Sequence, residues 1–87
     1  MIVSTDPRLA IRNFIIETFA FGEESALASD DASLLASGVL DSTDILELIV
    51  FIEESFQLEI SDEEVVRDNF DSVDALTRLV IRKQIPG

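Results

Sequence analysis

The sequence predicts an all-α fold of four helices, in which a long loop follows the first helix and the third helix is short. Apolar residues recur at helical spacing in three separate segments. A Ser-x-x-Glu capping box between the second and the last of them opens the short third helix. The chain has 87 residues, of which 47% are hydrophobic, and this is enough for one core. We therefore expect a single domain over residues 1–87.

The first helix is expected to begin at Pro7 and to end near residue 19 or 20, before Gly22. Asp6 can cap it, and proline at the first helical position gives up only an amide that lacks a helical partner. The spacing leaves Ile16 unplaced, whereas Phe19 could fold back into the core. The face that we assign to the core carries Ile11, Phe14, Ile15 and Thr18, with Phe21 near its edge.

A long connection over residues 22–40 follows this helix. A loop of this length in a compact domain is usually functional or contains an unrecognised element. We expect an ordered loop that its apolar residues hold to the core, with a short helical turn near residues 32–35. Gly38 can supply a backbone angle that other residues resist. The apolar residues lack helical spacing and are Leu27, Leu34, Leu35, Val39 and Leu40.

The second long helix is expected to begin at the Asp41-Ser42 pair and to end at Phe56. Either Asp41 or Ser42 can cap it, because both side chains offer an oxygen to the free amides of the first turn. One stripe should face the core and consists of Ile45, Leu48, Ile49, Ile52 and Phe56. The outer face mixes apolar and acidic residues, namely Asp44, Leu46, Glu47, Val50, Glu53 and Glu54.

The last third of the chain should contain a connector, a short helix and a final helix. The connector covers residues 57–60 with Ile60 buried, and the capping box Ser61–Glu64 opens a short helix through Arg67. Val65 and Val66 give this helix something to bury, and residues 68–71 should end it. The final helix should cover residues 72–83, with an inner face of Val73, Leu76, Thr77 and Val80.

The composition excludes several classes of function. The net charge of −12 would repel nucleic acids and anionic membranes and favours partners with basic patches. The chain has no His and no Cys, so the usual general base, thiolate nucleophile and zinc ligands are absent. We find no signal peptide, no apolar run that could span a membrane and no calcium-loop spacing among the acids. We expect a cytoplasmic monomer that is not an enzyme and holds no metal.

The run from Leu34 to Ser42, Leu-Leu-Ala-Ser-Gly-Val-Leu-Asp-Ser, resembles the acyl and peptidyl carrier proteins. Their pattern has a glycine a few residues before Asp-Ser, and an acidic amphipathic helix after it. The resemblance continues through Phe56, Ile60 to Glu63, Phe70 and Val73, and so covers most of the chain. It implies a four-helix bundle with a short third helix.

By this resemblance, Ser42 is the attachment point of 4′-phosphopantetheine, with Asp41 beside it in the motif. Carrier chemistry needs a thiol for thioesters, and this chain has none of its own. A serine hydroxyl at a helix start suits a phosphodiester, because the free amides and the helix dipole favour negative charge. The implied partners are a phosphopantetheinyl transferase that uses coenzyme A, an acyl- or aminoacyl-loading ligase, and downstream synthases or transferases with basic patches.

Two other interpretations compete with the carrier hypothesis. Asp-Ser before a helix is often only a cap, and the chain repeats the pattern at Asp71-Ser72-Val73-Asp74, where we expect capping alone. A small acidic helical interaction domain without a prosthetic group is therefore one alternative. A carboxylate-based enzyme is the other, and the absence of His, Cys and a glycine-rich phosphate loop argues against it. Gly38 and the long loop before Ser42 favour the carrier, since the second copy lacks both.

The outer face of the second long helix is the expected partner-recognition surface. Apolar anchors within an acidic rim suit docking against basic partners, although solvation alone can also explain a row of carboxylates. Thr43 departs from the carriers of fatty acid synthesis, which commonly have Leu after the serine. This departure favours a dedicated carrier, such as those loaded by AMP-forming ligases. The surface consists of Thr43, Leu46, Glu47, Val50, Glu53 and Glu54.

Overall fold

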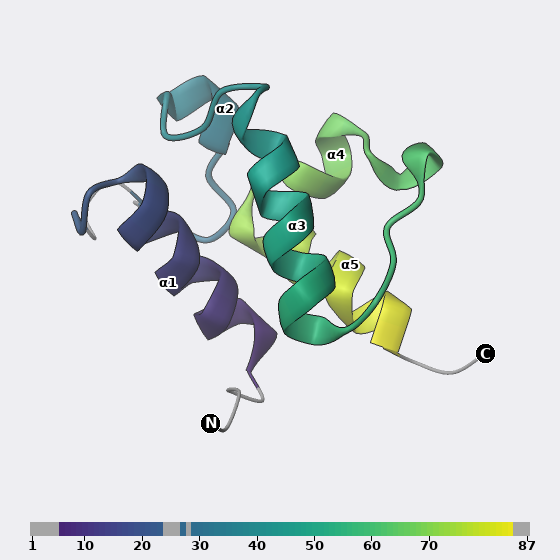
Figure 1. Ribbon diagram of the computed structural model, residues 1–87. Helices are drawn as coiled ribbons and strands as arrows, with labels where there is room; N and C mark the ends of the chain where they lie inside the picture. The colour runs from purple at the N-terminus through teal and green to yellow at the C-terminus, as the bar shows by residue number, and fades with distance from the viewer. Residues whose placement is uncertain (1–5, 24–26, 28, 85–87) are drawn as a thin grey trace.

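The computed structural model describes residues 6–23, 27 and 29–84, and this part of the chain is helical without strands. The all-α prediction is confirmed, and the elements form a small helical bundle (Figure 1). The α-helices are α1 (Pro7–Phe19), α2 (Leu34–Ser37), α3 (Asp44–Phe56), α4 (Arg67–Phe70) and α5 (Val73–Gln84), and a 3₁₀ helix, η2, covers Asp62–Glu64.

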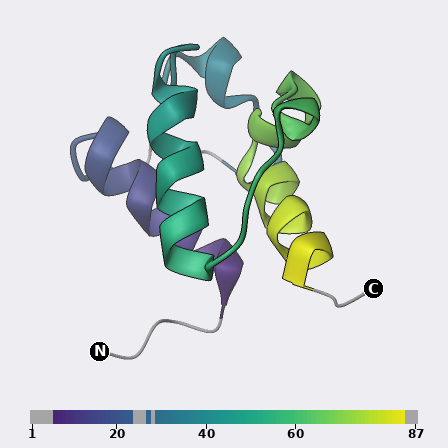
Figure 2. The same cartoon turned by 45° about the vertical axis from the view of Figure 1, so that its right-hand side comes forward.

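The long helices α1, α3 and α5 surround one apolar core. In Figures 1 and 2, α1 lies beside α3, while the short helices α2 and α4 both lie at the end where α3 begins. Helix α1 also packs directly on α5. The core takes side chains from all five α-helices, and its largest fully buried members are Phe70, Ile11, Ile15, Leu34, Leu48, Ile52, Leu76, Leu79, Val73 and Val80.

Helix α1 has the predicted ends but buries a different face. The Asp6 carboxylate accepts a hydrogen bond from the amide of Arg8, and Gly22 adopts φ +82° after the helix. The prediction for Thr18 and Phe21 is wrong, since Thr18 is exposed and Phe21 is 91% exposed. Phe21 itself has φ +55°, so the chain turns at this residue. Ile16 is buried instead.

The buried face of α1 is rotated because the long loop covers one side of the helix. Arg12 donates a hydrogen bond to the carbonyl of Leu27, which is itself buried. Phe19 folds back as expected, and its ring meets that of Phe14 edge to face with centroids 5.7 Å apart. Amphipathic spacing could not locate this face, because the covering element comes from elsewhere in the chain.

The loop between α1 and α3 is held to the core by apolar residues, as predicted. Leu27, Leu34 and Leu40 are buried, and Leu35 and Val39 pack against the core. The expected helical turn is α2, which begins two residues later than predicted because Ser33 caps it by accepting a hydrogen bond from the amide of Ala36 at 3.0 Å. Gly38 ends α2 with φ +84°, which confirms its predicted role.

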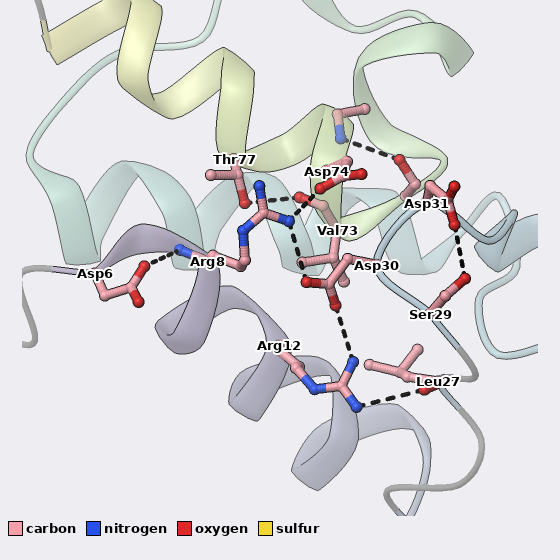
Figure 3. A network of polar contacts seen from close by, with 12 residues as sticks. Asp6, Arg8, Arg12, Leu27, Ser29, Asp30, Asp31, Val73, Asp74 and Thr77 are labelled. Atoms are coloured by element: carbon pink, nitrogen blue, oxygen red, sulfur yellow. Dashed lines mark hydrogen bonds and ion pairs between the residues drawn. The ribbon is translucent and has the colours of Figure 1, made fainter.

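A polar network, which the sequence did not predict, joins the loop to α1 and α5 (Figure 3). The guanidinium of Arg8 pairs with the carboxylates of Asp30 and Asp74, and Arg12 pairs with Asp30 at 3.0 Å. The Asp74 amide also donates to the carbonyl of Asp30 at 2.8 Å. The hydrogen bonds that the Arg8 guanidinium donates to Asp74 and then to Asp30 raise the pKa of Arg8. The network fixes the start of α5 against α1 and the loop.

The segment after α3 confirms the capping box but not the short helix that it was expected to open. Ser61 and Glu64 form the box, yet the helical turn η2 ends at Glu64. Val66 is extended, with φ −127° and ψ 155°, and both Val65 and Val66 are exposed rather than buried. Helix α4 then forms where a break was expected, because Phe70 supplies the apolar anchor. Ile60 is half-buried against the core.

Helix α5 confirms the prediction for the C-terminal part of the chain. Its four predicted inward residues are all buried, and Thr77 satisfies its hydroxyl by donating to the carbonyl of Val73 at 2.7 Å. Ser72 caps the helix by accepting a hydrogen bond from the amide of Ala75 at 3.0 Å. The Asp-Ser pair at this position therefore has the capping role that we expected.

Candidate functional site

Ser42 lies in a turn immediately before α3. The turn is closed by two hydrogen bonds between its ends: the Asp44 amide donates to the carbonyl of Asp41 at 3.0 Å, and the Asp41 amide donates to the carboxylate of Asp44 at 2.9 Å. The N-cap residue is Thr43, which makes no side-chain cap hydrogen bond. The prediction that Asp41 or Ser42 caps this helix is therefore wrong, because Asp44 reaches back and closes the turn instead.

This turn leaves the hydroxyl of Ser42 without a partner. Ser42 is exposed, and its hydroxyl makes no hydrogen bond to any residue that the structure describes. Asp41 and Thr43 on either side are exposed as well. A serine oxygen in this position is accessible to an enzyme that modifies it, and modification would break no contact of the fold.

The electrostatic environment of Ser42 combines two opposed effects. The start of α3 presents free amides and the positive end of the helix dipole, which favour an anion. Asp44 and Glu47 lie in the first turn and Asp41 precedes it, so three acidic residues lie close to Ser42 in the sequence. An anion attached to Ser42 therefore gains from the helix start but is repelled by its acidic neighbours.

An apolar recess of about 250 Å³ opens beside Ser42, between α2, α3 and α4. The sequence did not predict this recess, because Val65 and Val66 were expected to be the buried residues of a short helix. Their exposure in the structure, 38% and 48%, is the signal of an uncovered apolar wall. The residues that line the recess are Leu35, Ser42, Ile45, Val65, Val66, Arg67 and Phe70.

The predicted outer face of α3 is exposed, and it borders a groove against α1. Leu46 and Val50 are 69% and 51% exposed, and Glu47 and Glu54 are exposed beside them. The groove measures about 400 Å³, and Phe14 of α1 and Phe51 of α3 form its floor. The two rings are stacked with centroids 4.0 Å apart. The contribution of α1 was not predicted, since pairing between helices does not follow from the spacing within one.

Glu53 differs from the other predicted residues of this face. It is half-buried, and its carboxylate accepts a hydrogen bond from the amide of Ile60 at 2.9 Å. This contact ties the connector to the end of α3. Glu53 and Glu54 also line a hollow of about 720 Å³ with Lys83, which pairs with Glu64 at 2.8 Å. The bond from Lys83 and then that from the Ser61 amide lower the pKa of Glu64.

The residues around Ser42 fit the attachment of 4′-phosphopantetheine. The hydroxyl of Ser42 is exposed and has no partner among the described residues, it lies at the start of a helix, and the residue lines an apolar recess. Within the part of the chain that the structure describes, no group of three or more acidic residues could hold a metal ion. No helix there is long and apolar enough to cross a membrane.

A helical bundle with an exposed serine before an acidic helix has the features of a carrier protein. The comparison with known proteins supports this class. The chain is 35% identical over 81 residues to Aminoacyl carrier protein 1 of Bradyrhizobium diazoefficiens, an alignment that covers 88% of this chain and 89% of that protein. No protein-family model matches the chain. The chain therefore belongs to the carrier protein family, whose members are not enzymes.

Proposed function

We propose that this protein carries an acyl or aminoacyl group as a thioester on a 4′-phosphopantetheine arm attached to Ser42, and presents it to partner enzymes. The observation that carries the proposal is the exposed Ser42 hydroxyl, which has no partner in the described part of the chain and lies at the start of α3. The chain contains no cysteine, so the thiol must be supplied by an attached group. The relative named as an aminoacyl carrier protein favours an aminoacyl cargo.

The attachment step requires a separate transferase and coenzyme A. The Ser42 oxygen attacks the phosphorus that bears the pantetheine in the pyrophosphate of coenzyme A. A P–O bond to Ser42 forms, the bond to the bridging oxygen breaks, and adenosine 3′,5′-bisphosphate leaves. The proton of Ser42 passes to a base of the transferase, because this chain has no histidine to accept it. When bound, the arm supplies the thiol that forms the thioester.

The partner enzymes of the carrier, such as the transferase and a loading ligase, should dock on the outer face of α3. Leu46 and Val50 provide exposed apolar anchors, and Glu47 and Glu54 provide an acidic rim. Partners with basic patches are favoured, because complementary charge speeds encounter and the apolar anchors then stabilise the complex. Thr43 lies next to Ser42 and is touched by any enzyme that reaches the arm. The role of Glu53 on this face stays a prediction, since its carboxylate also accepts a hydrogen bond from the amide of Ile60.

The experiment is modification of the purified protein by a broad-specificity phosphopantetheinyl transferase with coenzyme A. Mass spectrometry should detect one added phosphopantetheine, and a thiol assay should find one titratable group where the unmodified chain has none. Ser42→Ala should abolish both signals. Ser72→Ala is the matched control, because it removes the equivalent serine of the second Asp-Ser pair and should leave both signals intact.

Modification that persists in Ser42→Ala would refute the assignment of the site. A wild-type protein that accepts no arm under these conditions would favour the acidic interaction domain instead. Localisation in the cytoplasm and a monomeric state stay predictions.

A further inference from the structure

Arg67 is the one basic residue among those that line the recess beside Ser42. It opens α4, and Figures 1 and 2 place α4 at the end of the bundle where α3 begins. The other walls of the recess are apolar apart from Ser42 itself. A cation therefore shares this hollow with the serine that we propose is modified.

The guanidinium of Arg67 is only loosely held. Its side chain is 65% exposed, and its ion pair is a contact of 3.4 Å from Nε to the carboxylate of Asp71. Arg8, Arg12 and Lys83 make contacts of 3.1 Å or shorter with their carboxylates. The terminal nitrogens of Arg67 have no partner among the described residues. Four N–H donors thus stay available for another anion.

Asp71 does not depend on this contact. Its carboxylate accepts closer hydrogen bonds from the hydroxyl of Ser33, at 2.7 Å, and from the amide of Leu35, at 2.9 Å. These two bonds satisfy both oxygens of the carboxylate. Arg67 can therefore turn toward another anion without leaving Asp71 unpaired.

A phosphodiester on Ser42 would need such a cation. It adds a negative charge at a point that Asp41, Asp44 and Glu47 already make acidic. The helix dipole favours this charge, and the negative carboxylates oppose it. A guanidinium is also suited to phosphate, because its planar fork can donate two parallel hydrogen bonds to the oxygens.

We propose that Arg67 is the counter-ion of the phosphodiester formed on Ser42, and that it directs the first, aliphatic part of the arm into the apolar recess. The inference rests on the proposed function of Ser42. Val65, Val66 and Phe70 supply the apolar walls that such a segment would cover. Arg67 is in this view a positioning residue, since it orients the arm and takes no part in forming the thioester.

The test compares the modified wild type with modified Arg67→Gln and Arg78→Gln. Arg78 is an exposed residue of α5 that does not line the recess, so its replacement removes the same charge from another surface. The first measurement is the ³¹P chemical shift of the phosphodiester during a NaCl titration. The wild type and Arg78→Gln should share a shift that moves with salt. Arg67→Gln should show a different shift, close to that of a small phosphodiester of serine in solution, with little dependence on salt.

The second measurement is the rate at which iodoacetamide alkylates the thiol. Loss of one solvent-exposed ion pair should raise this rate about two- to fivefold in Arg67→Gln and leave it unchanged in Arg78→Gln. Arg67→Lys should restore part of the protection, because it keeps the charge but loses the fork. In the wild type, the ¹H–¹⁵N signal of Arg67 Nε should also move when the arm is attached.

Equal ³¹P shifts and alkylation rates in the two glutamine variants, or an unmoved Arg67 Nε signal, would overturn the inference. The Nε signal needs no variant, so it decides the question even if Arg67→Gln folds poorly. A protein that accepts no arm at all would refute the proposed function instead, and mass spectrometry distinguishes that failure from this one.

Discussion

The two Asp-Ser-x-Asp segments of this protein have nearly the same sequence and opposite relations to the fold. Each precedes a long helix, the first α3 and the second α5. In the second copy every polar side chain has a structural contact: Asp71 holds the start of α2, Ser72 caps α5, and Asp74 pairs with Arg8. In the first copy, Asp44 is the only one of the equivalent side chains that makes a hydrogen bond to a residue that the structure describes, and this bond closes its own turn.

The two copies show that a short motif does not decide whether its serine is structural or available for modification. Ser72 is half-buried, and its hydroxyl oxygen accepts a hydrogen bond from the amide of Ala75. Ser42 is exposed, because Asp44 closes the turn and no element in the described part of the chain covers it. A serine thus caps the helix at the start of α5, whereas the serine before α3 makes no hydrogen bond to a described residue. Three pairs of matched substitutions test this contrast.

The largest difference in stability between the two copies should come from substitutions of their first residues. Asp71→Ala removes the carboxylate that accepts from Ser33 and Leu35, and it leaves those two donors unpaired at a half-buried position. We expect a loss of about 2–4 kcal/mol in the free energy of unfolding. Asp41→Ala removes an exposed side chain and should cost about 0.5 kcal/mol or less. Urea denaturation of both variants measures the difference.

The loss caused by Asp71→Ala should also depend on pH. Burial works to raise the pKa of Asp71, but the Leu35 amide, the Ser33 hydroxyl and the charge of Arg67 outweigh it and lower the pKa below its ordinary value of 3.8. A lowered pKa in the folded state stabilises the protein above the pKa of the unfolded chain, and this stabilisation disappears as pH falls through the folded value. The gap between wild type and Asp71→Ala should therefore be constant above about pH 5 and narrow below about pH 4. A gap independent of pH would contradict the assigned carboxylate contacts.

The third residue of each copy should give the next largest contrast. Val73 is fully buried, so Val73→Thr places a hydroxyl in the core and should cost about 1–2 kcal/mol. Thr43 is exposed, and Thr43→Val should change stability by about 0.5 kcal/mol or less. Thermal unfolding of the two variants provides the measurement. Similar losses at both positions would mean that Thr43 is buried in solution, against the structure.

The sequence predicted the elements whose signals are local. The buried stripe of α3, the caps Asp6 and Ser72, the capping box at Ser61 and the angle at Gly38 are all confirmed. Each depends on residues within one or two turns of each other. The residues around the Asp-Ser pair at the start of α3 predict that it is the site. They do not predict its geometry, because the Asp44 carboxylate accepts a hydrogen bond from the Asp41 amide and this turn replaces the expected cap.

The features that were missed depend on neighbours distant in sequence. Arg8 meets Asp74, which is 66 residues away, and Phe14 stacks on Phe51. The recess beside Ser42 combines side chains from α2, α3 and α4, and Val66, which also lines it, is extended. Helical spacing describes one element at a time, so it cannot indicate which faces of different elements meet.

The smallest contrast should come from the serines themselves. Ser72→Ala removes a cap whose oxygen accepts from the Ala75 amide at 3.0 Å, and loss of a serine cap costs typically about 1 kcal/mol. Ser42→Ala removes a hydroxyl that has no partner in the described part of the chain, so the unmodified protein should keep its stability within about 0.5 kcal/mol. Both variants differ from wild type by one oxygen, and urea denaturation of the unmodified proteins compares them directly. A loss in Ser42→Ala as large as that in Ser72→Ala would mean that Ser42 caps α3 in solution. Its hydroxyl would then have to leave that bond before a transferase could use it, and the contrast between the two copies would fail.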